Sequence, residues 1–507
     1  MFNGVIGSTQ RDTLKSYLVG LLGLVLVATG CSKPNTPSTT TTNSHLEISS
    51  GSTSTTLGQF NSDWPTYYGT IGRSGVDISS PQAVDTSTAW TNPIASKVYA
   101  QPLIVNGQVI LADEGNNVTS LDLSTGKVTW TVNLGNPVAG SSLPCGNIDP
   151  SGITGTPVVD PQEGKLWVVA FIQPTTTTSG GSSTSSTSST PTSSAPQTTS
   201  STQVPLGPPY HELFTLSLSN GAVLGSQNID PTGANPYVEQ QRGALTFANG
   251  YVYIPYGGLY GDCGDYHGFL QAVPVNFKAP TLTFETPASS QAGIWDPAGA
   301  VVIGGGDLVV ASGNGSSTTT IDGGNTVTEL SQLLGPMGTF TPSNSEALNQ
   351  DDLDLGSTNP VYLPGGYIFI AGKQGIGYIL NASSLGGVGG QLFEGEVCSK
   401  GAIGGAIYSG GYVYVSCNSS LVALKISKTT FQVAWKSQPG KAGPPIISGG
   451  NVWYVDITTG TLFGLNPLTA QVVNQYPLGS VVSFTSPAAA SGYLVVVGGG
   501  LVQAFNE

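Results

Sequence analysis

One short stretch of the chain gathers side chains that could do chemistry. Residues 261–268 read GDCGDYHG and hold two carboxylates, a thiol and one of only three histidines in the sequence. Asp262, Asp265 and His267 are the ligand types that a metal ion requires, and a histidine beside a carboxylate is a pairing used in acid–base catalysis. The alternative is a disulfide-pinned loop between strands, in which Asp and Gly serve the turns and His267 bonds to local backbone.

Two further groups of polar side chains could bind a ligand. Arg242 stands just before a predicted strand, where its guanidinium would bind an anion; the alternative is a surface salt bridge. Asp351, Asp352 and Asp354 offer oxygen ligands for Ca²⁺, but they lack the spacing of a calcium-binding loop, and a solvated turn is the alternative. The motifs of serine hydrolases, P-loop NTPases, zinc proteases and dinucleotide-binding enzymes do not stand in a supporting context.

We therefore predict no catalytic, cofactor-binding or metal-binding residue from motifs. Four residues remain as candidates for a site: Arg242, Asp262, Asp265 and His267.

The elements that must position these residues are short β-strands. Residues 101–131 read QPLIVNGQVILADEGNNVTSLDLSTGKVTWT, which is four β-rich runs separated by tight turns. Asn106-Gly107 predicts one turn because both residues tolerate a positive φ. Ser124-Thr125-Gly126 predicts another. A four-stranded meander of this kind is marginal alone and needs neighbours that cover its faces.

The same unit starts eight times along the chain. Each start has Pro or Ala at the first strand and a Gly five to seven residues later, before a β-rich run. The starts are Pro102, Pro157, Ala244, Ala300, Pro360, Ala406, Pro445 and Pro487. The eighth unit has three strands, and residues 89–94 read as a fourth strand without its first three. Joining them removes unpaired sheet edges. We predict an all-β fold, an eight-bladed β-propeller of four-stranded antiparallel blades, closed by an N-terminal strand that completes the last blade.

The N-terminus indicates an exported protein. Arg11 and Lys15 precede an apolar run of about a dozen residues, the length of a signal-peptide core. The run ends in Ala28-Thr29-Gly30-Cys31, which resembles the lipobox of bacterial lipoproteins, with Ala28 where that family most often has Leu. The resemblance implies a signal peptide over residues 1–30, lipidation of Cys31, and a place at the cell membrane or outer membrane, outside the cytoplasm. An ordinary secretory signal is the alternative.

Composition divides the rest of the chain. Residues 31–62 are rich in Ser, Thr, Asn and Pro and predict a flexible tether, followed by the propeller over residues 63–507. Residues 174–205, inside the second unit, are almost pure Ser, Thr, Pro and Gly, and we expect a disordered insertion. The net charge of −14 argues against a nucleic-acid partner.

Four cysteines follow Cys31, an even number that suggests two disulfides in an oxidising compartment. Cys398 and Cys417 are close in sequence, so we pair them, which leaves Cys145 with Cys263. A metal site is the alternative, but no CxxC spacing occurs.

Residues 121–130, LDLSTGKVTW, resemble the repeat of pyrroloquinoline-quinone (PQQ)-like propellers. The resemblance covers roughly residues 63–507, and the opening WPTYYG with Arg73 is also similar to segments that precede the first blade in that family. It implies that Trp130 packs between neighbouring blades and that the turn residues hydrogen-bond it. The matching repeat residues are Asp122, Thr125, Gly126 and Trp130.

The resemblance implies two kinds of function. Quinoprotein dehydrogenases of the family bind PQQ over a Ca²⁺ held by Glu, Asn and Asp, and often have a disulfide between adjacent cysteines, which this sequence lacks. Other members, such as the lipoprotein propeller of the outer-membrane barrel-assembly machinery, are scaffolds. We expect a non-catalytic binding or scaffold protein without a cofactor, which contacts another envelope protein through propeller-mouth loops. The alternatives are a quinoprotein-like dehydrogenase that uses PQQ and calcium on an alcohol or sugar, and a carbohydrate-binding surface protein.

Overall fold

The computed structural model describes residues 63–80, 87–178 and 202–506. The chain divides into two compact units, residues 1–54 and 55–507, and all described residues belong to the second. The predicted signal peptide, the predicted lipidation site Cys31 and the predicted tether therefore lie outside the described residues. Within the described part, no helix is long and apolar enough to span a membrane.

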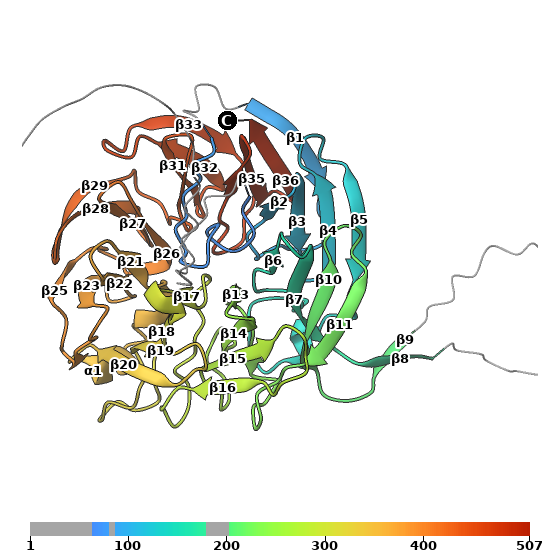
Figure 1. Ribbon diagram of the computed structural model, residues 1–507, viewed down its shortest axis with the longest axis horizontal. Coiled ribbons are helices and arrows are strands. Elements are labelled where there is room, and N and C mark those ends of the chain that lie inside the picture. The colour runs from blue at the N-terminus through green and yellow to red at the C-terminus, as the bar shows by residue number, and fades with distance from the viewer. Residues whose placement is uncertain (1–62, 81–86, 179–201, 507) are drawn as a thin grey trace, which may run out of the picture. The chain divides into compact units, whose positions relative to one another are not determined.

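Eight antiparallel sheets form the blades of a propeller, as predicted (Figure 1). Each blade is a meander of four strands, and each strand is short because a tight turn follows it. Blades 1 to 4 are β2 (Leu103–Val105), β3 (Gln108–Ala112), β4 (Asn117–Asp122), β5 (Val128–Asn133); β6 (Val158–Asp160), β7 (Lys165–Ile172), β10 (Tyr210–Ser217), β11 (Val223–Asn228); β13 (Thr246–Ala248), β14 (Tyr251–Gly258), β15 (Phe269–Pro274), β16 (Leu282–Glu285); and β17 (Val301–Val302), β18 (Leu308–Ala311), β19 (Val327–Leu330), β20 (Pro336–Thr341).

Blades 5 to 8 are β21 (Val361–Leu363), β22 (Tyr367–Ala371), β23 (Ile376–Asn381), β25 (Phe393–Glu396); β26 (Ala402–Ser409), β27 (Tyr412–Cys417), β28 (Leu421–Ser427), β29 (Thr430–Lys436); β30 (Ile446–Ser448), β31 (Asn451–Asp456), β32 (Thr461–Leu465), β33 (Val472–Pro477); and β34 (Ala488–Ala490), β35 (Tyr493–Gly498), β36 (Leu501–Asn506), β1 (Ser87–Pro93). Two short strands extend blades at their edges: β12 (Glu239–Gln240) pairs with β14, and β24 (Gly387–Val388) pairs with β20. A short helix, α1 (Ser345–Gln350), lies between blades 4 and 5.

The ring is closed by the N-terminal strand. β1 pairs antiparallel with β36, with Trp90 opposite Ala504, so the last blade takes its outermost strand from the start of the domain (Figure 1). This closure was predicted from the edge argument, and it leaves the eighth blade complete.

Tryptophans of outer strands join neighbouring blades. Trp130 on β5 donates from Nε1 to the Leu218 carbonyl of blade 2 at 3.1 Å, and Trp90 on β1 donates to the Leu123 carbonyl of blade 1 at 2.7 Å. The receiving turn carries a glycine against the ring: a Cβ built on Gly221 would lie 2.5 Å from Trp130. Asp122 shapes the same turn in blade 1 by accepting from the Thr125 hydroxyl at 2.7 Å.

This contact predicts a specific loss of stability for Gly221→Ala. Gly221 has a φ of +70° and faces Trp130, whereas Gly164, with a φ of +62°, has nothing within 4 Å of its built Cβ. Both alanines incur the backbone cost of about 1–2 kcal/mol, and Gly221→Ala alone must also displace an indole ring. We expect urea unfolding midpoints to place Gly221→Ala about 1–3 kcal/mol below Gly164→Ala. Equal midpoints for the two variants would show that the Trp contact is loose.

The long insertion of blade 2 is partly ordered at its ends. β8 (Thr175–Thr178) and β9 (Thr202–Pro205) form a two-stranded sheet, so the predicted disorder over residues 174–205 is wrong for these ends. The β-branched threonines favour extended pairing. Residues 179–201 lie outside the described part.

The segment before β1 lies inside the ring of innermost strands. Trp64 exchanges two backbone hydrogen bonds with Ile104 of β2, the Pro65 carbonyl accepts from Val159 of β6, and the Gly75 carbonyl accepts from Ile447 of β30. Residues 64–75, which we call the axial segment, thus bond to blades on several sides of the axis. Its largest side chains, Trp64, Tyr67, Tyr68 and Arg73, are at most 2% exposed.

Candidate functional site

The two ends of the propeller differ in loop length. The four strands of each blade are numbered from the axis outward. The connections from the first to the second strand and from the third to the fourth lie at one end of the propeller. The connection from the second to the third strand and the link to the next blade lie at the other end. The first end carries tight turns such as residues 106–107. The second end, which we call the long-loop end, carries segments such as residues 134–157, 259–268, 312–326 and 342–360.

Both disulfides lie at the long-loop end. Cys145, between β5 and β6, bonds to Cys263, between β14 and β15, and Cys398 bonds to Cys417 at the end of β27. Both predicted pairings are confirmed. Cross-links there restrict the loops that carry the polar residues of this end.

A ring of side chains surrounds the axis at this end, one from each of several blades. Tyr99, Thr154, Arg242, Pro297 and Phe484 each stand four residues before the innermost strand of a blade. They line one cavity of about 10 Å³ together with Tyr67 of the axial segment. We call this ring of five residues the central mouth. Its space corresponds to about one water molecule.

Arg242 lies between two aromatic rings of the mouth region. Its guanidinium carbon is 4.6 Å from the centre of the Phe484 ring and 5.7 Å from that of Trp295, both within the range of cation–π attraction. Within the described part of the chain, the guanidinium has no hydrogen bond or ion pair. Burial lowers the pKa of Arg242 to about 10, against the opposing influence of Tyr99 and Glu114, so the side chain remains charged at neutral pH.

Phe484 holds an unusual backbone conformation. Its φ is +69°, in the left-handed region that bulky residues rarely adopt. Such a conformation costs about 1–3 kcal/mol and persists only where the surrounding structure enforces it. The strained residue is the one that covers Arg242.

Lys373, between β22 and β23, brings a second cation to Trp295. Its Nζ lies 5.6 Å from the indole centre and pairs with Asp354 at 2.5 Å and with Asp352 at 2.9 Å. Burial lowers the pKa of Lys373, but the two carboxylates outweigh burial and raise it overall. In the acidic run considered for Ca²⁺, Asp352 and Asp354 pair with Lys373, while Asp351 and Asp352 are exposed to solvent, as in the solvated turn given as the alternative.

Glu114, between β3 and β4, is the carboxylate whose charge acts on Arg242. It is fully buried and accepts from the Gly152 amide at 2.6 Å and from the Thr154 hydroxyl at 2.9 Å. Burial raises the pKa of Glu114 to about 7, although these hydrogen bonds oppose the rise. Because its oxygens are engaged elsewhere and its charge is incomplete at neutral pH, Glu114 leaves Arg242 only partly compensated.

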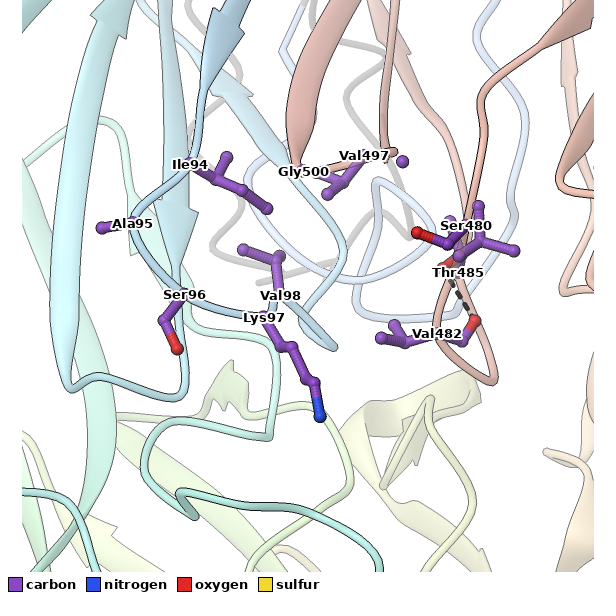
Figure 2. A pocket seen from close by; sticks show the side chains of 12 residues that line it. Ile94, Ala95, Ser96, Lys97, Val98, Ser480, Val482, Thr485, Val497 and Gly500 are labelled. Carbon is purple, nitrogen blue, oxygen red and sulfur yellow. Dashed lines mark hydrogen bonds between the residues drawn. The ribbon is translucent and has the colours of Figure 1, made fainter.

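An apolar hollow of about 380 Å³ adjoins the mouth at the junction of blades 8 and 1. Figure 2 shows Ile94, Val98, Val482 and Val497 around this space, with the Lys97 side chain extending along its edge. We define the apolar hollow by these four residues and Val481. Its volume is that of a small ligand site or of a pocket for one large side chain.

The stretch predicted to be most functional lies on a loop of the same long-loop end, and its residues do not line the central mouth. His267 has Nδ1 3.3 Å from Glu285 and Nε2 3.7 Å from Asp265, while Asp262 accepts from the Tyr266 hydroxyl at 2.7 Å. The His267 amide donates to the buried Glu239 at 2.9 Å. Three of the four candidates therefore belong to this disulfide-held loop, and only Arg242 lies in the central mouth.

Motif reasoning missed the other four residues of the central mouth, Tyr99, Thr154, Pro297 and Phe484, and the neighbours of Arg242 around it, Glu114, Trp295 and Lys373. Each of these residues lies next to a strand that the repeat predicted. Their position relative to those strands could therefore have indicated that they lie near the axis. Their types alone gave no such indication, because most of them are far apart in the sequence.

The resemblance to PQQ-like propellers implies a PQQ cofactor over a Ca²⁺ ion at the mouth. The residues present there do not fit this cofactor and this ion. The cavity beside Arg242 is about 10 Å³, far below the several hundred Å³ of usual cofactor sites. Among the described residues, no three His, Cys, Asp or Glu side chains come together so as to hold a metal ion. Glu114 and Asp354, the carboxylates of this region, are already bound to protein groups.

The known proteins that are similar to this chain include an outer-membrane assembly factor and alcohol dehydrogenases. A sequence profile for the family described as outer membrane protein assembly factor BamB matches residues 77–257. Among solved structures, the quinohemoprotein alcohol dehydrogenase of Comamonas testosteroni is 15% identical, with a TM-score of 0.65 over 88% of this chain and 80% of that one. A europium-containing methanol dehydrogenase is 12% identical, with a TM-score of 0.63 over 88% and 98% of the two chains.

BamB from Moraxella catarrhalis is 12% identical, with a TM-score of 0.51 over 84% of this chain and 98% of that one. No curated protein matches the chain in sequence. The profile match over residues 77–257 and the shared architecture make the chain similar to PQQ-like β-propellers. At these identities the structural likeness establishes the fold alone.

Proposed function

We propose that this protein is a non-catalytic binding protein of the cell envelope, whose long-loop end contacts another protein. The observation that carries the proposal is the central mouth itself. A partly compensated arginine and an apolar hollow stand side by side at the end with the long, disulfide-held loops, and the cavity beside the arginine is only about 10 Å³. The profile match to BamB supports this class, and the lipobox-like residues before Cys31 support an anchor outside the cytoplasm.

Site-specific photo-cross-linking in intact cells tests the proposal. Tyr260 and Ile321 are exposed at the long-loop end, and Leu333 and Leu468 are matched exposed positions in turns at the other end. We expect a photoreactive residue at either of the first two positions to form a cross-link to one envelope protein, and the same residue at Leu333 or Leu468 to form none. As a control on the anchor, Cys31→Ser should move the protein from the membrane to the soluble fraction.

Two outcomes would contradict the proposal. One is a cross-linking pattern that does not distinguish the two ends. The other is an increase in thermal stability with PQQ and Ca²⁺, together with dye reduction in the presence of an alcohol or sugar, which would establish the dehydrogenase alternative.

A further inference from the structure

The central mouth and the apolar hollow are built from the same two chain segments. Val98 lines the hollow and Tyr99 lines the mouth, while Val482 lines the hollow and Ser483 lines the mouth. Consecutive residues have Cα atoms about 3.8 Å apart. The two features are therefore immediate neighbours, and one extended ligand can reach both.

Positive charge gathers here in a protein that is otherwise negative. The sequence has three arginines against a net charge of −14. Of the two in the described residues, Arg73 is buried and already bonded within the protein, and Arg242 is the one left for a ligand. Lys97 is exposed at the rim of the hollow. Burial and the nearby Arg242 lower the pKa of Lys441, which places a further basic group in the same field. The site thus favours an anion.

The geometry limits the kind of anion. Arg242 is half-buried between Phe484 and Trp295, and the cavity beside it has room for very few atoms. A ligand must therefore reach the guanidinium with a small group while its bulk stays outside or enters the hollow. A carboxylate is the anionic group that protein side chains offer, and its two oxygens match the arginine fork.

We propose that this site binds an extended peptide segment of a partner protein, in which an acidic side chain pairs with Arg242 and a neighbouring large apolar side chain fills the hollow. The inference rests on the proposed function and specifies the chemistry of the partner. The aromatic rings beside Arg242 keep its guanidinium in place before binding, so that less side-chain entropy is lost when the carboxylate arrives. Charge complementarity selects an acidic segment, and the hollow of about 380 Å³ selects a residue such as Phe, Trp or Leu beside it.

A random hexapeptide library displayed on phage and selected on the full-length chain tests this inference. We expect enriched peptides to carry Asp or Glu within three residues of Phe, Trp or Leu. Synthetic versions of these peptides should bind Arg242→Gln at least tenfold more weakly than wild type. Replacing their acidic residue by Asn or Gln should weaken binding to wild type equally, and should have little further effect on Arg242→Gln.

Matched variants separate the two contacts. Val482→Ser should reduce selection for the apolar residue but keep the acidic one, and Lys425→Gln, an exposed lysine of β28, should bind as wild type does. Absence of enrichment, enrichment without an acidic residue, or equal binding to wild type and Arg242→Gln would each overturn the inference. If cross-links still form at Tyr260 and Ile321 in that case, the binding function stands and only this site is wrong.

Discussion

Replacing Arg73 by Met is expected to lower the free energy of unfolding by about 3–5 kcal/mol. Arg73 is 2% exposed and donates four hydrogen bonds, two within the axial segment and two to blade 3. Nη1 donates to the Thr66 hydroxyl at 2.6 Å and the Tyr67 carbonyl at 3.0 Å, and Nη2 donates to the Leu245 carbonyl at 3.2 Å and the Thr246 hydroxyl at 2.6 Å. Methionine fills similar space but donates no hydrogen bond, so these buried acceptors lose their Arg73 donors, although the Leu245 carbonyl keeps the Thr66 hydroxyl at 3.3 Å.

The loss has a second cause in Asp296. This carboxylate is fully buried, and the charge of Arg73 favours its ionised form. Removing the cation leaves a buried acid that must take up a proton or stay charged without compensation. Midpoints of urea unfolding measure the change. Arg73→Lys should recover part of the loss, since it keeps the charge without the planar fork.

Limited proteolysis adds a local readout for the same variant. If the axial segment is held mainly by Arg73, cleavage within residues 63–80 should become faster in Arg73→Met than in wild type. A decrease in unfolding free energy below about 1 kcal/mol, with unchanged proteolysis, would mean that the backbone pairing of Trp64 and Gly75 holds the segment without Arg73.

Wild-type protein is expected to be less stable at pH 8 than at pH 5 because of buried carboxyl groups. Burial raises the pKa of Glu239 to about 8 and those of Glu114 and Asp296 to about 7. Between the unfolded pKa, near 4.5 for Glu, and these folded values, the native state binds more protons than the unfolded state. Stability is therefore full below about pH 4.5 and is lost as pH rises through the folded pKa.

Glu239→Gln isolates the largest of these contributions. Glu239 is 1% exposed; one of its oxygens accepts the His267 amide, and the other has no hydrogen-bond partner in the described residues. Glutamine resembles the protonated acid and does not ionise. The variant should match wild type at pH 5 and exceed it at pH 8 by an amount on the order of 2–4 kcal/mol, at about 1.4 kcal/mol per pKa unit.

Unfolding midpoints measured across pH 5–8 provide the comparison, with Glu163→Gln as the control at an exposed glutamate. That control should follow the wild-type curve. If the unfolding midpoints of wild type and Glu239→Gln change in parallel with pH, Glu239 is ionised in the native state at neutral pH. A cation or solvent must then compensate its charge.

The propeller was predictable from sequence because its determinants are local and repeated. Asn106-Gly107 and the glycines that follow each unit start set tight turns, and β-rich runs of uniform spacing set the strands. Ring closure by residues 87–93 followed from counting strands, since an unpaired edge has a clear physical cost. The two disulfides followed from proximity in the chain and an even cysteine count.

The binding region was decided only by the tertiary structure. Residues 261–268 were the strongest candidates in the sequence because their polar side chains are adjacent there, yet they do not line the central mouth. The central mouth instead joins Tyr99, Arg242 and Phe484, which are separated by most of the chain and carry no motif. Only closure of the ring brings such positions to one axis, and the lengths of the loops that hold them follow no repeat. The sequence therefore determines the blades, while the packing of those blades around the axial segment determines which side chains meet.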